Sequence, residues 1–241
     1  MKRPNFLFLL MIITSIFVSY ANSQIVTASA PNLIGVRFTA TKERGEQRLR
    51  GSTAGGYRCL QPVSRSPEAI VPLNSVVTTI NSNPPLYIYL PKQDKARSAE
   101  FRIEDSDGEN VLYESSLLTS GKEGIIKLNF PNTVVLESGK NYRWSFIVVC
   151  DEEGVSSNPF VNGIIRRVEP TDRLNSQLQQ EIDPLKQAKL YAAASIWQEA
   201  LDIMIEQRQM YPKEWQEFLR SVKLEKYNTT PFLDCCNAED G

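Results

Sequence analysis

Residues 136–150, LESGKNYRWSFIVVC, contain the clearest structural pattern in the chain. From Asn141 onward every second side chain is apolar or aromatic: Tyr142, Trp144, Phe146, Val148 and Cys150. A period of two places these side chains on one face of a β-strand. Aromatic residues at this spacing are far more often core than surface, so we predict a core strand. An exposed ladder that stacks on sugar rings is the alternative.

The residues that lead into this strand have the pattern Leu-x-x-Gly-x-x-Tyr-x-Trp, formed by Leu136, Gly139, Tyr142 and Trp144. A tyrosine just inside a sandwich strand can bury its ring and bond its hydroxyl to nearby backbone. The pattern resembles the tyrosine corner of fibronectin-type and immunoglobulin-like sandwiches. It supports that architecture and implies no activity.

Other short strand-like segments lie on both sides of residues 136–150. They cover residues 70–73, 86–90, 100–104, 110–114, 124–130 and 160–168. Asp107-Gly108, between two alternating runs, predicts a β-hairpin. Several short strands separated by turn residues are typical of an antiparallel sandwich. We therefore predict an antiparallel β-sandwich, immunoglobulin/fibronectin-like, over residues 59–169.

After Pro170 the apolar period becomes helical. One stripe steps by four, three, four and three residues through Leu190, Ala194, Trp197, Leu201 and Met204. It predicts one amphipathic helix of about six turns that begins at Asp183 and Pro184. Pro212 begins a second helix, so we predict an α-helical hairpin over residues 170–227 that packs on the sandwich. Residues 228–241 are predicted as a flexible tail.

The N-terminus has the three parts of a secretory signal peptide. A basic start precedes an uncharged apolar run, residues 6–20, and Ala21-Asn22-Ser23 follows it. We predict a signal peptide over residues 1–23 and a protein exported to the periplasm or the medium. Retention as an anchor is the alternative, but the apolar run spans about 22 Å as a helix, against a roughly 30 Å hydrocarbon core. After cleavage we expect no stable membrane span.

Residues 24–58 are predicted as a flexible Arg/Gly-rich arm. The segment has few apolar residues, so it cannot bury enough surface to offset the entropy of ordering. A basic arm that grips an anionic glycan, a lipid or a protein partner is the functional alternative. Its candidate interaction residues are Arg44, Arg48, Arg50 and Arg58. The net charge of the whole chain is −1, which gives no general attraction to nucleic acid.

The chain has four cysteines, Cys59, Cys150, Cys235 and Cys236. In an exported protein, cysteines favour disulfides. Cys59 precedes the first predicted strands and Cys150 ends the central one, so we expect these two to pair. Four cysteines allow three connectivities, and the sequence alone does not select one. Cys235 and Cys236 lie in a polar tail, where an intermolecular bridge or a free thiol is expected rather than a zinc site.

The inventory of chemical groups argues against several classes of site. The chain has no histidine, the commonest general base and the commonest metal ligand. It also has no G-x-S-x-G, P-loop or G-x-G-x-x-G motif. Two acidic groups, residues 104–109 and 151–153, fall where turns are expected and lack the spacing of a calcium loop. We therefore predict no catalytic residue, no cofactor and no metal.

These observations favour an exported, non-enzymatic β-sandwich module with a protein-interaction or structural role in the cell envelope. Its partner would be an envelope protein or a glycan. One alternative is an envelope hydrolase that uses carboxylates such as Asp105 or Asp151, or a Ser–Lys pair, because neither needs histidine. The other alternative is a carbohydrate-binding module, which requires exposed aromatic side chains; Tyr87 and Tyr89 are the candidates.

Several stretches in the same order carry a family resemblance. They are Gly55-Gly-Tyr-Arg-Cys59, Pro85-Leu-Tyr-Ile-Tyr-Leu-Pro91, Phe101-Arg-Ile-Glu-Asp105, Gly139-Lys-Asn-Tyr-Arg-Trp144, Val149-Cys-Asp151, Gly163-Ile-Ile-Arg-Arg-Val168, Ile196-Trp-Gln-Glu-Ala-Leu201 and Trp215. Together they resemble the cyanobacterial domain-of-unknown-function family 928, a family of exported proteins. The resemblance runs from about residue 45 to residue 225. It implies a sandwich followed by helices, and it implies no catalytic residues, because the family has no established activity.

Overall fold

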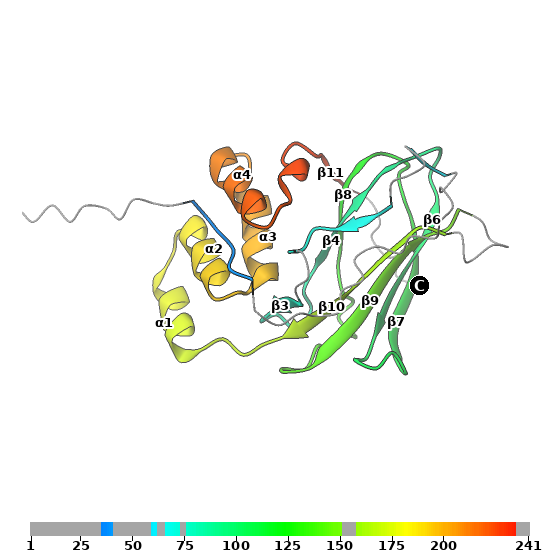
Figure 1. The fold of residues 1–241 in the computed structure, drawn as a ribbon. Coiled ribbons are helices and arrows are strands. Elements are labelled where there is room, and N and C mark those ends of the chain that lie inside the picture. The colour runs from blue at the N-terminus through cyan, green and yellow to red at the C-terminus, as the bar shows by residue number, and fades with distance from the viewer. Residues whose placement is uncertain (1–34, 41–58, 62–65, 73–75, 151–157, 235–241) are drawn as a thin grey trace, which may run out of the picture. The chain divides into compact units, whose positions relative to one another are not determined.

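The structure, a computed structural model, describes residues 35–40, 59–61, 66–72, 76–150 and 158–234 (Figure 1). They belong to one compact unit, residues 34–241. The described residues form two main β-sheets, one short two-stranded sheet and four α-helices that follow the sheets, so the fold is mixed. The predicted signal peptide and the four arginines of the predicted arm lie outside the described residues.

The larger sheet has five strands in the order β3-β10-β9-β6-β7. These strands are β3 (Val77–Thr79), β6 (Ser98–Glu104), β7 (Val111–Leu118), β9 (Asn141–Val148) and β10 (Phe160–Arg167). Neighbouring strands are antiparallel except β3 and β10, which are parallel. The predicted hairpin is confirmed: it joins β6 to β7, and Gly108 in its turn has φ +75°, a conformation that favours glycine.

The second main sheet has four strands in the order β11-β8-β4-β2. They are β2 (Glu68–Ala69), β4 (Leu86–Leu90), β8 (Gly124–Leu128) and β11 (Phe232–Leu233). A separate two-stranded sheet pairs β1 (Leu60–Gln61) with β5 (Lys92–Gln93). Both main sheets contribute side chains to one buried hydrophobic cluster. Phe101 of β6 and Phe130, just after β8, have ring centroids 5.9 Å apart, so the two sheets share a core.

The strand predicted within residues 136–150 is β9, and its aromatic face is buried. Tyr142, Trp144, Phe146 and Val148 are each at most 5% exposed, which confirms the predicted period. Trp144 lies opposite Gly163 of β10, where a Cβ atom would be 2.7 Å from the indole ring. Glycine at this position therefore makes room for the tryptophan. The alternative of an exposed aromatic ladder on this strand is wrong.

The predicted tyrosine corner is confirmed. The Tyr142 hydroxyl accepts a hydrogen bond from the backbone N–H of Glu137 at 2.8 Å. Residues 137–140 form a turn in which the N–H of Lys140 donates to the carbonyl of Glu137 at 3.3 Å. Gly139, at the third position, has φ +78°. A positive φ at this position is typical of a type II turn, which explains the glycine in the pattern.

Four helices follow the sheets, where a hairpin of two was predicted. They are α1 (Asp172–Gln180), α2 (Pro184–Ala193), α3 (Trp197–Gln207) and α4 (Pro212–Ser221), and the 3-10 helix η2 (Glu225–Tyr227) follows. The predicted start of α2 is confirmed, because the Asp183 carboxylate accepts from the Leu185 N–H at 2.8 Å and Pro184 is the first helical residue. The predicted long helix is wrong: Ser195, with φ +61°, separates α2 from α3.

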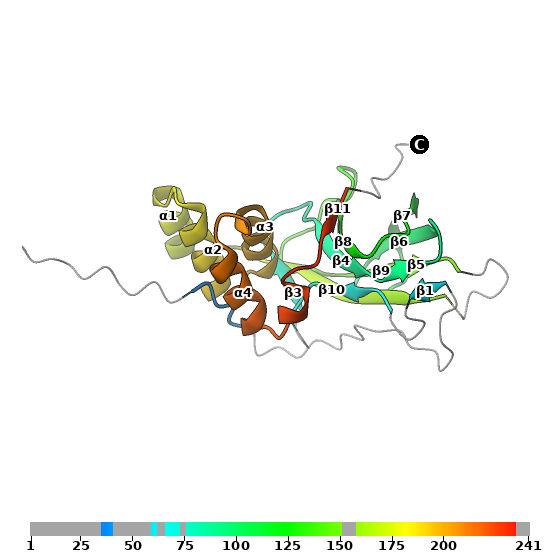
Figure 2. The ribbon, with the colours of Figure 1, turned by 90° about the horizontal axis from the view of Figure 1, so that it is seen from above.

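Helix α3 lies against β3 and joins the helices to the sheets (Figure 2). Trp197 at its first position is fully buried and stacks on Phe218 of α4, with ring centroids 5.0 Å apart. The indole N–H of Trp197 donates to the carbonyl of Ile70 at 3.0 Å. One tryptophan thus contacts a second helix and the chain next to β2.

Residues 35–40 complete the helical core. Phe38 meets the ring of Trp197 edge-on at 4.9 Å, and its N–H donates to Ser221 Oγ at 3.0 Å. Val36 is fully buried. The prediction of a flexible arm is therefore wrong for these six residues, because two apolar side chains anchor them between the helices. The remainder of the predicted arm lies outside the described residues.

The predicted flexible tail, residues 228–241, is also wrong in part. Strand β11 lies within it and pairs in parallel with β8. The N–H of Ile125 donates to the carbonyl of Pro231 at 2.8 Å. Gly124 permits this close approach, because a Cβ atom there would lie 2.5 Å from the side chain of Leu233. The tail therefore supplies one edge strand of the four-stranded sheet and covers the edge of β8.

Candidate functional site

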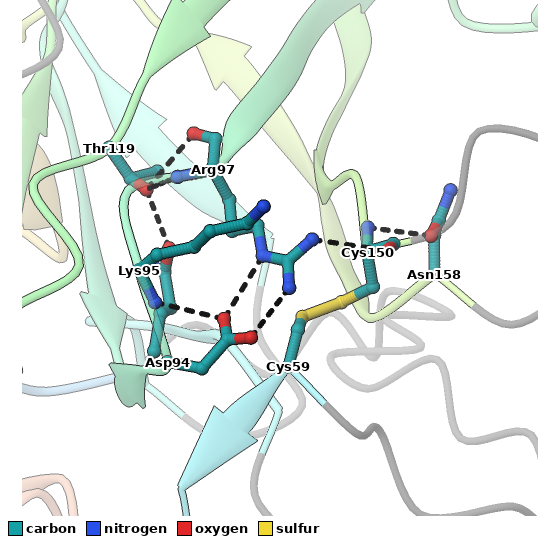
Figure 3. Close-up of a disulfide and its surroundings, with 8 residues drawn as sticks. Cys59, Asp94, Lys95, Arg97, Thr119, Cys150 and Asn158 are labelled. Carbon is teal, nitrogen blue, oxygen red and sulfur yellow. Dashed lines mark hydrogen bonds and ion pairs between the residues drawn. A yellow bond between two sulfur atoms is a disulfide. The ribbon is translucent and has the colours of Figure 1, made fainter.

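The two cysteines predicted to pair lie at disulfide distance. Cys59 is in the turn before β1, and Cys150 follows β9. Their Cα atoms are 5.6 Å apart, and Figure 3 draws the link between their sulfur atoms. They are separated by 91 residues in the sequence, so the link ties the start of the described sheets to the end of the central strand. Cys235 and Cys236 lie outside the described residues.

An aspartate–arginine pair from the turn between β5 and β6 holds both cysteine segments in place (Figure 3). Arg97 contacts the Asp94 carboxylate through Nε at 3.0 Å and through Nη2 at 2.7 Å, and its Nη1 donates to the carbonyl of Cys150 at 3.3 Å. The N–H of Asp94 donates to the carbonyl of Cys59 at 3.1 Å. The hydrogen bond from Arg97 lowers the pKa of Asp94. These contacts are structural, and they could not be predicted from the sequence because an Asp-x-x-Arg turn has no distinctive pattern.

The candidate functional site is a cavity of about 640 Å³ where the β6–β7 turn meets the connection from β8 to β9. It is lined by Asp105 and Ser106 of the turn, by Leu112 of β7, and by residues of the connection and the start of β9 between 133 and 142. Its volume falls within the range of roughly 300–1,000 Å³ that is usual for ligand pockets. Three segments that are separate in the sequence therefore enclose one concave surface.

The connection from β8 to β9 is held by hydrogen bonds from other segments. Asn83 Nδ2 donates to the carbonyl of Val134, and Arg167 Nη1 donates to the carbonyl of Leu136 at 2.8 Å. The tyrosine corner fixes the end of the same connection through Tyr142. Both Val134 and Leu136 are buried. This wall of the cavity is therefore formed before any ligand arrives.

The β6–β7 turn forms the opposite wall, and Asp105 organises it. The Asp105 carboxylate accepts hydrogen bonds from the N–H of Glu109 at 3.0 Å and from Asn110 Nδ2 at 2.5 Å. The hydrogen bond from Asn110 lowers the pKa of Asp105. A carboxylate that caps a turn and stays ionised is poorly suited to act as a general acid. Asp105 thus has the turn role predicted for the acidic group at residues 104–109.

Two exposed apolar side chains line the cavity. Ile103 pairs with Tyr113 while Glu104 pairs with Val111, so Leu112 is the extra residue of a β-bulge. Bulges redirect side chains at the ends of sheets, and Leu112 is 44% exposed at the cavity. Val135, on the opposite wall, is 58% exposed. An apolar ligand group can therefore be covered from both sides.

The charged and hydroxyl groups of the cavity contact neighbouring side chains. Lys140 Nζ lies 2.8 Å from the Glu137 carboxylate, and this hydrogen bond raises the pKa of Lys140. Ser106 Oγ donates to Asp107 at 3.2 Å. Ser106 and Lys140 both line the cavity, but they do not bond to each other in the way that the hypothetical Ser–Lys hydrolase requires. The lining therefore combines two exposed apolar side chains with charged and polar side chains.

The tyrosines proposed for carbohydrate binding are buried. Tyr87 is 3% exposed and Tyr89 is 4% exposed. The Tyr87 hydroxyl donates to Asp202 of α3, and burial together with Asp202 raises the pKa of this tyrosine. The Tyr89 hydroxyl donates to Glu123 at 2.6 Å. Both side chains therefore join structural elements, and the carbohydrate-binding hypothesis loses the exposed aromatic residues on which it depended.

Among the residues that the structure describes, no other predicted site residue lines the cavity. The candidate arginines of the arm and the acidic group at residues 151–153 lie outside the described residues. Within the described ranges, no three His, Cys, Asp or Glu side chains gather in a way that could hold a metal ion. No described helix is long and apolar enough to cross a membrane.

A comparison with protein families matches the greater part of the chain. The family described as Domain of Unknown Function (DUF928) matches residues 43–232. The matched range includes the cysteine pair and both walls of the cavity. No curated protein matches the chain.

Proposed function

We propose that this chain, which belongs to the family of the Domain of Unknown Function DUF928, is a protein-interaction module. We also propose that it is not an enzyme. In this proposal the cavity beside the tyrosine corner receives an apolar side chain of the partner. The observation that carries the proposal is a preformed cavity in which Leu112 and Val135 are exposed on opposite walls.

Two properties of the cavity support binding to a protein. Its walls are fixed by internal hydrogen bonds, so binding has a small entropic cost of ordering. Its lining holds the exposed Leu112 and Val135 together with polar groups such as the Glu137–Lys140 ion pair, and protein interfaces likewise combine apolar and polar surface. An extended segment with one large apolar side chain fits both properties.

We also propose that the protein acts after export, in the periplasm or the medium. The signal-peptide pattern of residues 1–23 and the cysteine pair at disulfide distance support an oxidising compartment. We further propose that the two main sheets form an immunoglobulin-like sandwich. The tyrosine corner and the shared core support this architecture.

The test is a selection of displayed peptides on the purified protein, followed by affinity measurements with variants. Val135→Glu introduces a charge opposite the exposed Leu112. It should lower the affinity for the selected peptides at least tenfold, or by about 1.4 kcal/mol. Ile182→Glu is the matched control, because Ile182 is 91% exposed between α1 and α2, away from the cavity. Its affinity should equal that of the wild type. The proposal fails if no peptide is selected or if both variants weaken binding equally.

The non-enzymatic part of the proposal has a separate test. A turnover screen with glycan and peptide substrates should detect no activity. Activity that is abolished by Asp105→Asn or by Asp151→Asn would establish the carboxylate hydrolase instead. Tyr87→Phe serves as a control, because it removes a hydroxyl that lies between β4 and α3 rather than in the cavity.

A further inference from the structure

Strand β7 leaves a long edge on the five-stranded sheet. Among the described strands, β7 pairs with β6 alone. It has eight residues, whereas the other edge strands of the two main sheets, β3, β2 and β11, have three, two and two. A long edge strand presents a row of backbone N–H and C=O groups that can pair with another chain.

The backbone groups at this open edge belong to even-numbered residues. The N–H of Thr119 donates to the carbonyl of Arg97 at 2.9 Å, on the side of β6. In an antiparallel pair, alternate residues point toward the same neighbour, so Tyr113, Ser115 and Leu117, on the near side of the bulge, bond to β6. The backbone groups of Glu114, Ser116 and Leu118 therefore point to the open edge.

The side chains on one face of β7 are exposed along its whole length. Leu112, Glu114, Ser116 and Leu118 are exposed, whereas the odd-numbered residues between them are partly or fully buried. Leu118 is 68% exposed and Leu112 is 44% exposed. A large apolar side chain near each end of an open edge is a liability in a monomer, because it promotes pairing with another strand.

We propose that β7 pairs antiparallel with β7 of a second copy of this chain. Leu112 of each copy lies opposite Leu118 of the other, Glu114 lies opposite Ser116, and the twofold axis passes at Ser115. The two five-stranded sheets then form one continuous sheet across the dimer. The sequence of β7 is complementary to itself in this register, which favours a second copy over an unrelated partner.

The side chains select this register among those that the open edge allows. A shift of two residues in one direction places Glu114 opposite itself, and two like charges directly opposite each other are destabilising. A shift of two residues in the other direction places Glu114 opposite Leu118 and leaves Leu112 without an apolar partner. In the proposed register both leucine pairs are apolar, and Arg102 on the same face contacts Glu114 at 2.9 Å.

The inference stands apart from the proposed binding function. Glu114, Ser116 and Leu118 do not line the cavity, so a partner peptide and a second copy use different surfaces. Leu112 is the residue common to both, and the dimer would bring the second copy's Leu118 beside the cavity mouth. A single pair of strands buries a small area, so the dimer should be weak and the dimeric fraction should rise with protein concentration.

Cross-linking between variants that each carry one cysteine besides the Cys59–Cys150 pair tests the register. Glu114→Cys and Ser116→Cys are prepared separately in a chain that also carries Cys235→Ser and Cys236→Ser, and a short thiol-bridging reagent is added. Covalent dimers should form faster in the mixture than in either preparation alone, because directly opposite Cβ atoms are about 4.5–5.5 Å apart and diagonal ones about 7–8 Å. The proposal is overturned if one variant alone cross-links as fast as the mixture, or if the mixture gives no dimer.

Sedimentation velocity over a concentration series tests the association. The wild-type chain should shift from monomer to dimer as its concentration rises, and Leu118→Glu should remain monomeric. Ile182→Glu is the matched control, because it adds the same charge at an exposed apolar residue outside β7 and away from the cavity, and it should dimerise like the wild type. A wild-type chain that is monomeric throughout, or a dimer that persists in Leu118→Glu, overturns the proposal.

A pair of opposite charges across the proposed interface should restore the dimer, and a misfolded variant would not be restored in this way. Leu112→Lys together with Leu118→Glu in one chain places each lysine opposite a glutamate of the second copy, so the dimer should return. The melting temperature of each variant, measured in parallel, reports whether the chain is folded. A folded double variant that stays monomeric contradicts the register.

Discussion

The hydroxyl of Tyr142 stabilises the wall of the cavity through one hydrogen bond. It accepts the N–H of Glu137 while the ring is buried between the sheets. Tyr142→Phe keeps the ring and leaves this N–H without its acceptor, so the free energy of unfolding should fall by about 1 kcal/mol. A chain of this size should then melt about 2–4 °C lower in a thermal unfolding experiment.

Tyr211→Phe provides the control for this change. Its ring is partly buried, and its hydroxyl has no hydrogen bond to another described residue. The melting temperature of this variant should remain at the wild-type value. Equal shifts in the two variants would show that loss of any tyrosine hydroxyl is responsible, rather than loss of the corner.

Glu199 links α3 to the chain that follows β3. One of its carboxylate oxygens accepts hydrogen bonds from Thr79 Oγ1 at 2.6 Å, from the N–H of Ile80 at 2.8 Å and from the N–H of Asn81 at 3.0 Å. Its other oxygen is buried and has no partner among the described residues. Burial raises the pKa of Glu199 above its ordinary value of 4.5, although these hydrogen bonds oppose the shift.

The raised pKa of Glu199 determines the sign of a pH dependence. A carboxyl group whose pKa is higher in the folded chain stabilises the fold while it is protonated, and this contribution is lost as the pH rises from 4.5 through the raised value. Glu199→Gln keeps an oxygen acceptor but does not titrate. The melting temperature of the variant relative to the wild type should therefore rise as the pH increases from 4 to 8.

Glu214→Gln is the matched control for Glu199→Gln. Glu214 lies at the third position of α4, as Glu199 lies at the third position of α3. The melting temperature of Glu214→Gln relative to the wild type is measured over the same pH range, and an equal rise would assign the trend to any glutamate in the first turn of a helix rather than to Glu199. A Glu199→Gln variant whose relative melting temperature falls with increasing pH would contradict the assigned direction.

At the scale of elements, the break between α2 and α3 depends on one residue. Ser195 has φ +61°, and its N–H donates to the carbonyl of Ala192 at 3.3 Å. A left-handed conformation costs roughly 1–2 kcal/mol for a residue with a Cβ atom, and glycine does not have this cost. Ser195→Gly should therefore increase the free energy of unfolding by about 1 kcal/mol in a denaturant titration.

Ser195→Val tests the same conformation in the opposite direction. A β-branched side chain at positive φ is more strongly strained than serine, so this variant should be less stable than the wild type. If the valine variant were as stable as the glycine variant, the left-handed conformation at residue 195 would be refuted.

The helix break shows why periodicity alone predicted one helix where there are two. Leu190, Trp197, Leu201 and Met204 keep a helical spacing across the break, but only the last three lie in the core. Helix α2 reaches the same core through Leu185, Ala188 and Ala192, whereas Leu190 is half-buried. No glycine or proline marks the break, and serine at positive φ gives no signal in the sequence. The starts of α2 and α4 could be predicted, because each has proline at its first position.

Strands could be predicted where the pattern was long enough to have a period. Strand β9 alternates over eight residues, and the hairpin of β6 and β7 has Asp-Gly in its turn. Strands β1, β2, β5 and β11 have two residues each, which is too short for any alternation. Their positions depend on tertiary pairing, such as the parallel contact of β11 with β8.

The cavity could not be predicted from sequence patterns, for a related reason. Asp105, Leu112 and Val135 come from three segments, and their proximity follows from a bulge and from hydrogen bonds over long sequence separations. The cysteine pair could be predicted, because the expected compartment and the position of Cys150 at the end of a core strand both favoured it.

At the scale of the whole molecule, the Cys59–Cys150 link joins segments 91 residues apart. Closing a loop of this length restricts the unfolded chain and stabilises the fold by about 4–5 kcal/mol in the chain-entropy model. Cys150→Ser, or reduction of the wild type, should lower the melting temperature by on the order of 10 °C.

The double variant Cys59→Ser with Cys150→Ser controls for other effects of the reducing agent. Its melting temperature should match that of the reduced wild type and should not change when the reductant is added. A wild-type chain whose melting temperature is the same under oxidising and reducing conditions would contradict the link between the two cysteines.

The pairing of β11 with β8 has a consequence for the biosynthesis of the protein. Translation produces β8 well before the helices and β11, which is the last strand of the described chain. The edge of β8 that pairs with β11 therefore stays unpaired until the helices and β11 have been translated. The nascent polypeptide carries an open β-edge for the later part of its synthesis, a form on which chaperones can act before the fold closes.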